Sequence, residues 1–331
     1  MTQTSPTSNI ASMPGVPDVL AVSRLSPLYA APLQANYRVH DRLHEGDAAA
    51  RAALAELAPR IRAIAASGES KVPASLIAQL PALQIISVMG VGYDGIDVAA
   101  AKARGVVVTH TPEVLNDDVA DLAIGLMLSA ARQLPAADRY VREGRWPSGP
   151  MPLARKMSGA RLGIVGMGRI GQAIAHRALA FGMQIAYTTR TPRPELPYRH
   201  VPDVVALAAA SDFLVAITPG GAGTRKLINA QVLAALGKDG ILVNVARGSV
   251  VDEAALVDAL ERGVIAAAGL DVFENEPQVP ERLRALPQVV LAPHIGSATG
   301  ATRQAMADLA FGNLQAHFAQ RPLLSPVPEC R

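Results

Sequence analysis

Three side chains of complementary chemistry follow predicted strands in the second half of the sequence. Arg247 lies in NVARG, Glu276 in GLDVFENEP and His294 in PHIGS. A guanidinium binds a carboxylate with paired hydrogen bonds, and an imidazole beside a carboxylate can donate a proton. Because parallel strands end at one edge of a sheet, the three side chains are expected to converge on one ligand. Taken singly, each residue has an equally good structural explanation. Arg247 could cap a helix, Glu276 could be a turn carboxylate before proline, and His294 could be a hydrogen-bonded loop histidine.

A glycine-rich turn must position a second ligand at the same edge. A buried strand over 162–165 is followed by Gly166, Gly168 and Gly171, spaced as GxGxxG, and then by a helix over 170–181. This order is the dinucleotide-binding fingerprint. Gly166 forms the tight turn, Gly168 lets the backbone approach a pyrophosphate, and Gly171 allows close packing of helix and strand. The helix N-terminus then faces the pyrophosphate.

The next predicted strand, 184–188, indicates which dinucleotide binds. An acidic residue that would hold the ribose hydroxyls of NAD is absent, and the strand is followed by Thr189, Arg190 and Thr191, with Arg193 nearby. A guanidinium can bind a 2′-phosphate, and no carboxylate is present to repel it. The alternative is a solvated arginine that stacks on adenine without discriminating. The pattern favours NADP(H) over NAD(H).

The first third of the chain alternates strands and helices, which predicts a parallel sheet. Strands are expected at 19–23, 37–43, 61–66, 85–89 and 106–110, and helices at 48–57, 73–80 and 98–104. The strand over 85–89 ends in the loop GVGYDG. Its structural explanation is a tight turn, and its functional explanation is a set of backbone N–H groups that holds an anion such as a carboxylate.

A second alternating block predicts a doubly wound domain. Strands are expected at 162–165, 184–188, 213–217, 241–244, 266–270 and 289–291, and helices at 170–181, 204–210, 230–236 and 253–262. A long helix from Val119 to about Tyr140, with Asn116 or Asp117 as its N-cap, is expected to bridge the domains. Trp146 lies in a loop over 142–153, where a lone aromatic favours an interface or a substrate pocket. A last helix is expected over 302–319.

The composition narrows the classes of protein. The 331 residues are enough for two domains, and the net charge of +3, without long charged runs, gives no case for a nucleic-acid or membrane partner. The single cysteine, Cys330, excludes a disulfide or a cysteine metal site within one chain, and no metal is expected. Residues 1–17 lack the features of a signal peptide and are expected to be a flexible tail. The longest apolar helical pattern, 119–131, is too short to span a membrane, so a cytoplasmic setting is expected.

Together, GxGxxG, NVARG, GLDVFENEP and PHIGS resemble the D-isomer-specific 2-hydroxyacid dehydrogenases. The resemblance extends from about Val19 to the C-terminal helix. Within the family, VGYDGID from Val91 and VLNDDVAD from Val114 are most similar to the glyoxylate/hydroxypyruvate reductase and hydroxyphenylpyruvate reductase branch. The TRT at 189–191 agrees with the use of NADPH in that branch.

The resemblance implies NADPH-dependent reduction of a small 2-keto acid, such as glyoxylate or hydroxypyruvate, to the D-2-hydroxy acid. His294 would donate the proton, Glu276 would pair with it, and Arg247 would bind the substrate carboxylate. Val91 and Gly92 would hold the other side of that carboxylate through their N–H groups. The implied cofactor-binding residues are Gly166, Gly168, Arg169, Ile170, Gly171, Thr189, Arg190, Thr191, Thr218, Pro219, Thr224, Val245, Ala246, Arg247, Asp271, His294 and Gly296.

The family also implies two Rossmann-like or flavodoxin-like parallel-sheet domains with an active-site cleft between them. Residues 18–112 plus 300–331 would form the substrate domain, and 113–299 the NADP-binding domain. A homodimer is implied, in which Trp146 would be a pocket residue delivered by the partner. Two alternatives remain: a reductase of a larger 2-keto acid, hydroxyphenylpyruvate or 2-ketogluconate, and a non-catalytic nucleotide-sensing binding protein.

Overall fold

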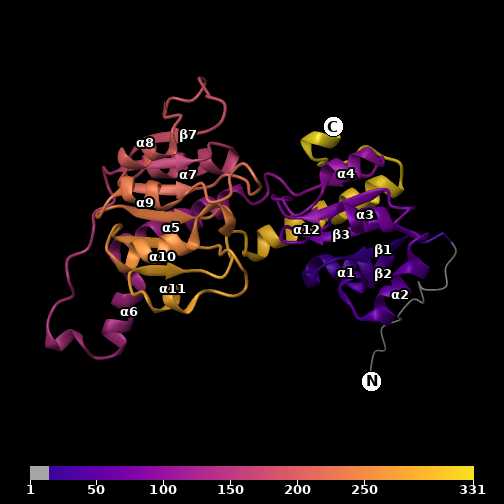
Figure 1. Cartoon of the computed structure of the whole chain (residues 1–331), viewed down its shortest axis with the longest axis horizontal. Helices are drawn as coiled ribbons and strands as arrows, with labels where there is room; N and C mark the ends of the chain where they lie inside the picture. Colours follow the sequence, from indigo (N-terminus) through magenta and orange to yellow (C-terminus); the bar gives the residue numbers. More distant parts are fainter. Residues whose placement is uncertain (1–14) are drawn as a thin grey trace. The chain divides into compact units, whose positions relative to one another are not determined.

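The computed structural model describes residues 15–331, which form two compact α/β units (Figure 1). Unit 1 comprises Met1–Val114 and Thr299–Arg331, of which residues 1–14 are not described. Unit 2 comprises Leu115–Ala298. Most of the predicted tail, 1–17, therefore lies outside the described residues. The fold class predicted from the alternation of strands and helices, two parallel-sheet α/β domains, is confirmed.

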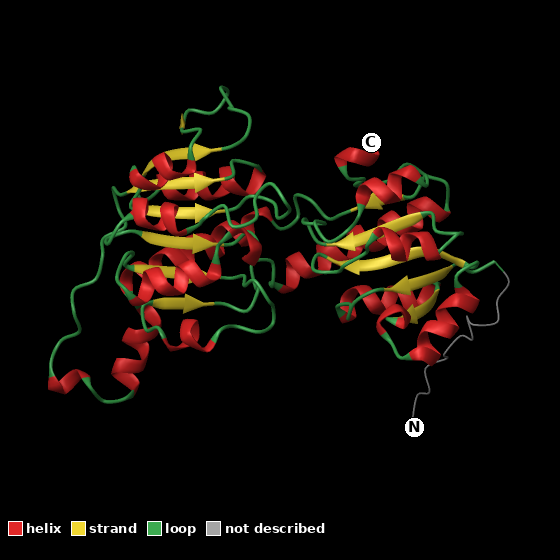
Figure 2. Ribbon diagram, viewed as in Figure 1, coloured by secondary structure: helices red, strands yellow, loops and turns green. Residues whose placement is uncertain are grey.

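Unit 1 contains a five-stranded parallel sheet in the order β2-β1-β3-β4-β5 (Figure 2). The strands are β1 (Asp18–Ala21), β2 (Arg38–Asp41), β3 (Ile61–Ser67), β4 (Ile85–Met89) and β5 (Val107–Thr109). The helices are α1 (Pro27–Asn36), α2 (Ala48–Leu57), α3 (Ala74–Gln79), α4 (Val98–Ala103) and α12 (Gly300–Phe318), with short η2 (Leu43–Glu45) and η5 (Pro328–Cys330). Every residue of β4 is buried, as expected of a central strand covered on both faces.

Unit 2 contains a seven-stranded parallel sheet in the order β12-β11-β10-β9-β6-β7-β8. The strands are β6 (Arg161–Val165), β7 (Gln184–Thr188), β8 (Arg199–His200), β9 (Phe213–Ala216), β10 (Ile241–Asn244), β11 (Ala267–Leu270) and β12 (Val289–Leu291). The helices are α5 (Asn116–Arg132), α6 (Leu134–Arg142), α7 (Arg169–Leu179), α8 (Val204–Ala209), α9 (Ala230–Leu236), α10 (Glu253–Glu261) and α11 (Glu281–Ala285), with η3 (Trp146–Ser148) and η4 (Gly248–Val250). The strand order reverses between β6 and β9, which is where doubly wound sheets bind ligands.

The single long helix predicted from Val119 to Tyr140 is wrong. Two helices, α5 and α6, are separated by Gln133, whose backbone is left-handed at φ 54°. Pro135 lacks the N–H that would continue the helical hydrogen bonds to Ala131. The Ala131 carbonyl accepts instead from the N–H of Arg155, 2.9 Å away, so the chain leaves α5 and returns to its end.

The predicted N-cap of α5 is also wrong. Leu115 occupies that position and makes no side-chain cap hydrogen bond. Asp117 lies in the first turn and binds Arg177 of α7 at 2.9 Å, so its carboxylate joins two helices rather than capping one. Ion pairing between elements that are distant in the sequence is not readable from a local capping pattern.

Besides the short 3-10 helices η2 to η5, the helices α1 and α11 and the short edge strand β8 were not predicted from the sequence. Helix α1 was missed because Pro32 lies inside it, and an internal proline argues against a helix. The start of the helix is nevertheless well formed, since the Ser26 side chain accepts from the N–H of Leu28 and Pro27 occupies the first position. Burial of Tyr29 and Leu33 against the sheet stabilises the helix despite this internal proline. Within residues 15–331, no helix is long and apolar enough to cross a membrane.

Candidate active site

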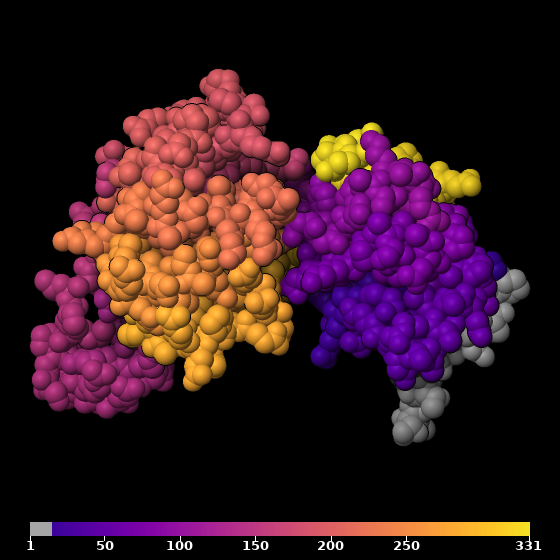
Figure 3. Space-filling view, viewed as in Figure 1, coloured from indigo at the N-terminus to yellow at the C-terminus, as the bar shows by residue number. Residues whose placement is uncertain are grey.

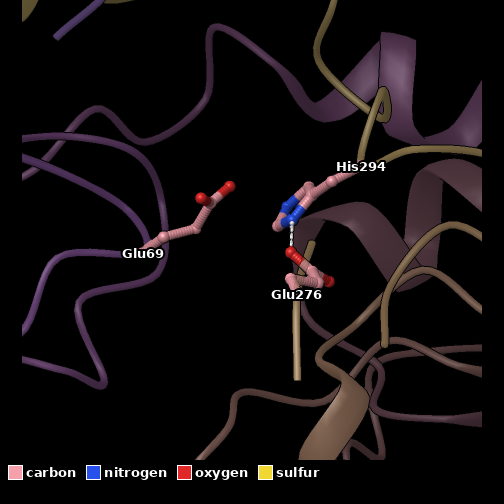
Figure 4. Close-up of side chains that lie close together, drawn as sticks. All are labelled: Glu69, Glu276 and His294. Atoms are coloured by element: carbon pink, nitrogen blue, oxygen red, sulfur yellow. Dashed lines mark hydrogen bonds and ion pairs between the residues drawn. The ribbon is translucent and has the colours of Figure 1, made fainter. Parts of the chain in front are cut away.

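The centre of the site in unit 2 is a hydrogen-bonded pair formed by His294 and Glu276 (Figure 4). Nδ1 of His294 lies 2.7 Å from Oε2 of Glu276, and both side chains are partly exposed. The other oxygen of Glu276 accepts from the N–H of Phe273 at 2.8 Å. A carboxylate oxygen that binds Nδ1 fixes both the orientation of the ring and the nitrogen that carries the hydrogen. The structure therefore brings together two of the three residues predicted to be catalytic.

The pKa of Glu276 reflects opposing effects. Burial raises it, but the hydrogen bond and charge of His294, the Phe273 N–H and the charge of Arg247 lower it more, so that its pKa lies below the usual 4.5. Glu276 therefore stays ionised at neutral pH and stabilises a positive charge on the imidazole. The positive charge of Arg247 is thus one of the influences that lower the pKa of Glu276.

Arg247 follows β10 in a turn that Asn244 organises. The side chain of Asn244 donates to the Arg247 carbonyl and accepts from the Ala246 N–H, both at 3.0 Å. A side chain at Gly248 would collide with the backbone of Phe273. Because glycine permits this contact, the turn that carries Arg247 packs directly on the loop that carries Glu276.

A buried carboxylate holds the turn of His294. Asp271, which is 2% exposed, accepts from the N–H groups of Ile295 at 2.7 Å and Gly296 at 2.8 Å. His294 itself has a left-handed backbone at φ 53°, and its N–H donates to the Asp271 carbonyl at 2.8 Å. A non-glycine residue keeps such a conformation where its surroundings enforce it. Burial raises the pKa of Asp271 although both hydrogen bonds lower it.

Glu253, at the start of α10, is a supporting residue that the sequence analysis missed. Its Oε2 accepts from the N–H of Glu274 at 3.2 Å, two residues before Glu276. Burial and the charges of Glu274 and Glu276 raise its pKa, while the backbone hydrogen bond lowers it. The only signal in the sequence was a glutamate six residues after Arg247, at the start of a predicted helix.

The fingerprint turn has the shape that a dinucleotide requires. Gly166 has φ 107°, and a Cβ there would lie 2.7 Å from the Ile217 carbonyl, whereas a Cβ at Gly171 would collide with the Gly166 carbonyl. A Cβ at Gly168, by contrast, would meet nothing within 4 Å, so the N-terminus of α7 has an open approach. An open helix N-terminus of this kind fits a pyrophosphate.

Arg190, just after β7, carries a positive charge that no other described group pairs with. The guanidinium of Arg190 is exposed and makes no hydrogen bond or ion pair within residues 15–331. Arg193, by contrast, donates to the Met167 carbonyl at 3.1 Å and pairs with Glu195 at 2.8 Å. Thr189 closes the turn by donating to the Thr191 carbonyl at 2.7 Å. No acidic residue occupies positions 189–191.

The other predicted cofactor residues also follow strand ends of this sheet. Thr218 and Pro219 follow β9, and Thr224 closes their loop by donating to the Pro219 carbonyl at 2.7 Å. Val245 and Ala246 follow β10 and are buried. Gly296 lies beside Asp271, where an added Cβ would approach the carboxylate to 3.0 Å. The sheet therefore places the predicted set along one edge.

Two predicted substrate-binding positions lie in unit 1 and a third in a projecting part of unit 2. Val91 and Gly92 are in the loop 90–95 that follows β4. Trp146 is 67% exposed in η3, within the segment 133–155 that stands out from the remainder of unit 2 (Figure 3, magenta). The structure shows no contact of Trp146 with Arg247 or His294 in the described chain, so its role as a pocket residue stays a prediction.

A family model and several known proteins match this chain. The family described as D-isomer specific 2-hydroxyacid dehydrogenase, NAD binding domain, matches residues 124–296. Glyoxylate/hydroxypyruvate reductase A HPR2 of Arabidopsis thaliana is 51% identical over 81% of this chain and 85% of the relative. Hydroxyphenylpyruvate reductase of Plectranthus scutellarioides is 50% identical over 83% of this chain and 88% of the relative.

A solved structure extends the likeness to nearly the whole fold. It is the NADPH-dependent glyoxylate/hydroxypyruvate reductase of Sinorhizobium meliloti in complex with NADP and malonate. It is 46% identical, with a TM-score of 0.87, and the alignment covers 95% of this chain and 97% of the other.

The chain belongs to the D-isomer-specific 2-hydroxyacid dehydrogenase family. Its relatives place it in the branch of the glyoxylate/hydroxypyruvate and hydroxyphenylpyruvate reductases, and it is an NAD(P)-dependent enzyme of that class. The alternative of a non-catalytic nucleotide sensor is therefore set aside.

Proposed function

We propose that this enzyme uses NADPH to reduce a small 2-keto acid, glyoxylate or hydroxypyruvate, to the D-2-hydroxy acid. The observation that carries the proposal is the 2.7 Å hydrogen bond between His294 and Glu276, in the electrostatic field of Arg247. Such a group of residues can donate a proton and bind a carboxylate, which are the two tasks that reduction of a 2-keto acid demands. The relatives named glyoxylate/hydroxypyruvate reductases support the choice of substrate.

The residues divide the work as follows. When bound, the nicotinamide cofactor supplies a hydride to the keto carbon. His294 holds its Nδ1 hydrogen toward Glu276 and delivers a proton from Nε2 to the keto oxygen. The ionised Glu276 favours the imidazolium beforehand and keeps the ring from rotating. Arg247 binds the substrate carboxylate and polarises the neighbouring carbonyl.

The cofactor is held, in this proposal, by the fingerprint turn and the end of β7. Gly166, Gly168 and Gly171 admit the pyrophosphate to the start of α7. The exposed Arg190 binds the 2′-phosphate, which gives the preference for NADPH. Replacing Arg190 with alanine is expected to lower kcat/KM with NADPH about tenfold or more and to leave kcat/KM with NADH within about twofold. Equal losses with both cofactors would contradict the assignment.

A panel of substrates tests the choice of keto acid. Steady-state oxidation of NADPH, and separately of NADH, is measured with glyoxylate, hydroxypyruvate, hydroxyphenylpyruvate and 2-ketogluconate. The proposal predicts that the keto acid with the highest kcat/KM is glyoxylate or hydroxypyruvate, and that this value is reached with NADPH as the cofactor. A higher value with hydroxyphenylpyruvate or 2-ketogluconate would support the second candidate, a reductase of larger acids, which the likeness to a hydroxyphenylpyruvate reductase favours.

We also infer that two copies of the chain associate through the segment 133–155. Four large apolar side chains of this segment are exposed, Leu134, Val141, Trp146 and Leu153, and α6 buries none of its residues. Exposed apolar surface of this kind is typical of an interface. Light scattering after gel filtration is expected to give twice the mass of one chain, and the double replacement of Trp146 and Leu153 by serine to give the mass of one. A wild-type monomer would overturn the inference.

A cytoplasmic location is part of the same proposal. It rests on the single cysteine, which is typical of proteins of reducing compartments, where disulfides are rare. Fractionation of cells that produce the full chain, followed by immunodetection, tests it, and recovery in a membrane or secreted fraction would contradict it.

A further inference from the structure

Two backbone N–H groups of the loop 90–95 have no hydrogen-bond acceptor. They belong to Val91 and Gly92, and within residues 15–331 neither donates to any group. Successive N–H groups left open in a glycine-rich loop at a strand end form a site for an anion. The conformation of the two peptide groups decides whether both face the same ligand.

The carbonyls of the same two peptide groups are held by consecutive residues after β5. The N–H of Thr111 donates to the Gly90 carbonyl at 2.9 Å. Nδ1 of His110 lies 3.0 Å from the Val91 carbonyl and must carry the hydrogen, because a carbonyl only accepts. In a trans peptide the C=O and the following N–H point in opposite directions. The N–H groups of Val91 and Gly92 therefore both point away from His110 and Thr111.

A chain of hydrogen bonds fixes His110 in turn. Its carbonyl accepts from the Ser325 hydroxyl at 2.6 Å, and its N–H donates to the Ser325 carbonyl at 3.2 Å. The amide of Asn313, which is fully buried in α12, donates to the Ser325 hydroxyl at 2.8 Å and accepts from the Ser325 N–H at 3.1 Å. A buried amide with these partners has little freedom. Asn313 of α12 therefore helps to fix the direction of the Val91 and Gly92 N–H groups, because it holds Ser325, which in turn holds His110.

The C-terminal η5 restrains the same loop from a second point. The hydroxyl of Tyr93 donates to a Glu329 oxygen at 3.1 Å, and the Tyr93 ring meets the ring of His110 edge-on at 5.2 Å. Burial and the Glu329 charge raise the pKa of Tyr93 to about 12, so its hydroxyl stays a donor at neutral pH. The opposite side of the loop is closed by backbone, because a Cβ at Gly90 would lie 2.7 Å from Cα of Gly68.

We propose that His110 is a positioning residue, whose Nδ1–H bond to the Val91 carbonyl aims the Gly92 N–H at the substrate carboxylate, and that Glu329 restrains the same loop through Tyr93. The inference rests on the proposed function for the identity of the anion. Neither residue touches the substrate in this arrangement. Each acts by lowering the freedom of the loop, so the effect falls on binding of the carboxylate rather than on transfer of the proton or hydride.

Two replacements of His110 separate the lost hydrogen bond from lost packing. His110→Leu removes the donor and keeps the bulk, whereas His110→Asn places an amide donor near the position of Nδ1. The KM for the keto acid, kcat, the KM for NADPH and the inhibition constant of malonate, a simple dicarboxylate, are measured for both. For His110→Leu we expect the keto-acid KM and the malonate constant to rise about tenfold, with kcat within about twofold and the NADPH KM unchanged.

For His110→Asn both constants are expected to return to within about threefold of wild type. An unchanged malonate constant in His110→Leu, or an equal defect in His110→Asn, would overturn the role of His110. A purely structural role would instead lower kcat and the affinities for NADPH and malonate together.

Glu329 is exposed, so its replacement tests the restraint without threatening the core. Tyr93→Phe and Glu329→Ala are each expected to raise the malonate constant about threefold, and the double variant no further, because they break one interaction. Glu329→Gln keeps an acceptor and is expected to match wild type. If the malonate constant of the double variant rose by the product of the two single effects, Tyr93 and Glu329 would act independently, and their proposed joint role would be wrong.

The same set of proteins separates this inference from the proposed function. Should wild type fail to oxidise NADPH with any 2-keto acid, while calorimetry shows malonate bound more weakly by His110→Leu, the proposed substrate would be wrong and the inference would stand. Turnover by wild type, with unchanged malonate binding in His110→Leu, would leave the proposed function intact and overturn the inference.

Discussion

Two turns that end strands are held by different chemistry in the two units. In unit 2, carboxylates hold the turn of His294, since Asp271 accepts two backbone N–H groups and Glu276 binds the ring. In unit 1, a backbone N–H and the imidazole of His110 hold the peptide groups of the loop 90–95. We infer that the function of the first turn depends on charge and pH, whereas that of the second depends on geometry.

The largest effect is expected where a carboxylate supports the backbone of unit 2. In Asp271→Asn, one of the two N–H groups of Ile295 and Gly296 loses its acceptor, and His294 loses its enforced conformation. We expect kcat to fall about 100-fold and the free energy of unfolding to fall by about 1–3 kcal/mol. Urea unfolding and steady-state kinetics measure both, with the exposed Asp239→Asn as control. A kcat within threefold of wild type would contradict the supporting role.

The second prediction concerns the pH dependence of the Glu276–His294 pair. The folded-state pKa of Glu276 is lowered, so its ionised form stabilises the fold above pH 4.5, and this contribution is lost as the pH falls through the folded-state pKa. Glu276→Gln is therefore expected to be less stable than wild type at pH 7, with the difference shrinking below pH 4.5. Urea unfolding at several pH values measures it. A difference that grows toward acid pH would have the wrong sign.

Glu253 should behave in the opposite way. Its folded-state pKa is raised, so its contribution to stability is present at low pH and lost as the pH rises through that pKa. Glu253→Gln keeps an acceptor for the Glu274 N–H and removes repulsion from Glu274 and Glu276. We expect the variant to match wild type in stability near pH 4 and to exceed it slightly at pH 7, with kcat within about threefold. Lower stability at pH 7 would show that the charge itself is required.

An effect without pH dependence is expected in unit 1. Ser325→Ala removes the hydroxyl between His110 and Asn313. The free energy of unfolding is expected to fall by about 1–2 kcal/mol, equally at pH 5.5 and pH 8, and the keto-acid KM to rise about twofold to threefold. Unfolding at the two pH values provides the check. A loss that differs between them by more than about 1 kcal/mol would break the contrast between the units.

Much of the sheet architecture was predictable because it follows from local patterns. Continuous apolar runs bounded by glycine and proline located strands such as β4 and β6, and their alternation with helices gave the parallel fold. The break between α5 and α6 was missed because apolar periodicity continues past Gln133. The decisive evidence there is the Ala131 carbonyl that accepts from Arg155, a contact across more than twenty residues.

The candidate site likewise has a part that local sequence patterns predict and a part that they do not. Arg247, Glu276 and His294 were accessible to sequence reasoning because each lies in a distinctive motif after a strand. Two residues that support loops were not accessible, because Glu253 accepts from the Glu274 N–H and His110 donates to the Val91 carbonyl, both backbone groups of other segments. A hydrogen bond to a backbone group has no signature in the spacing of side chains, and only the folded chain shows which backbone group is within reach.

The central claim is that His294 donates the proton in reduction of a small 2-keto acid. The most direct test is a single turnover of bound NADPH with glyoxylate, or with hydroxypyruvate if that acid is preferred, in wild type and in His294→Gln. We expect the rate of NADPH oxidation to fall by about 10²–10⁴-fold, with the NADPH dissociation constant within about fivefold of wild type. A variant that oxidises NADPH within tenfold of the wild-type rate would contradict the account.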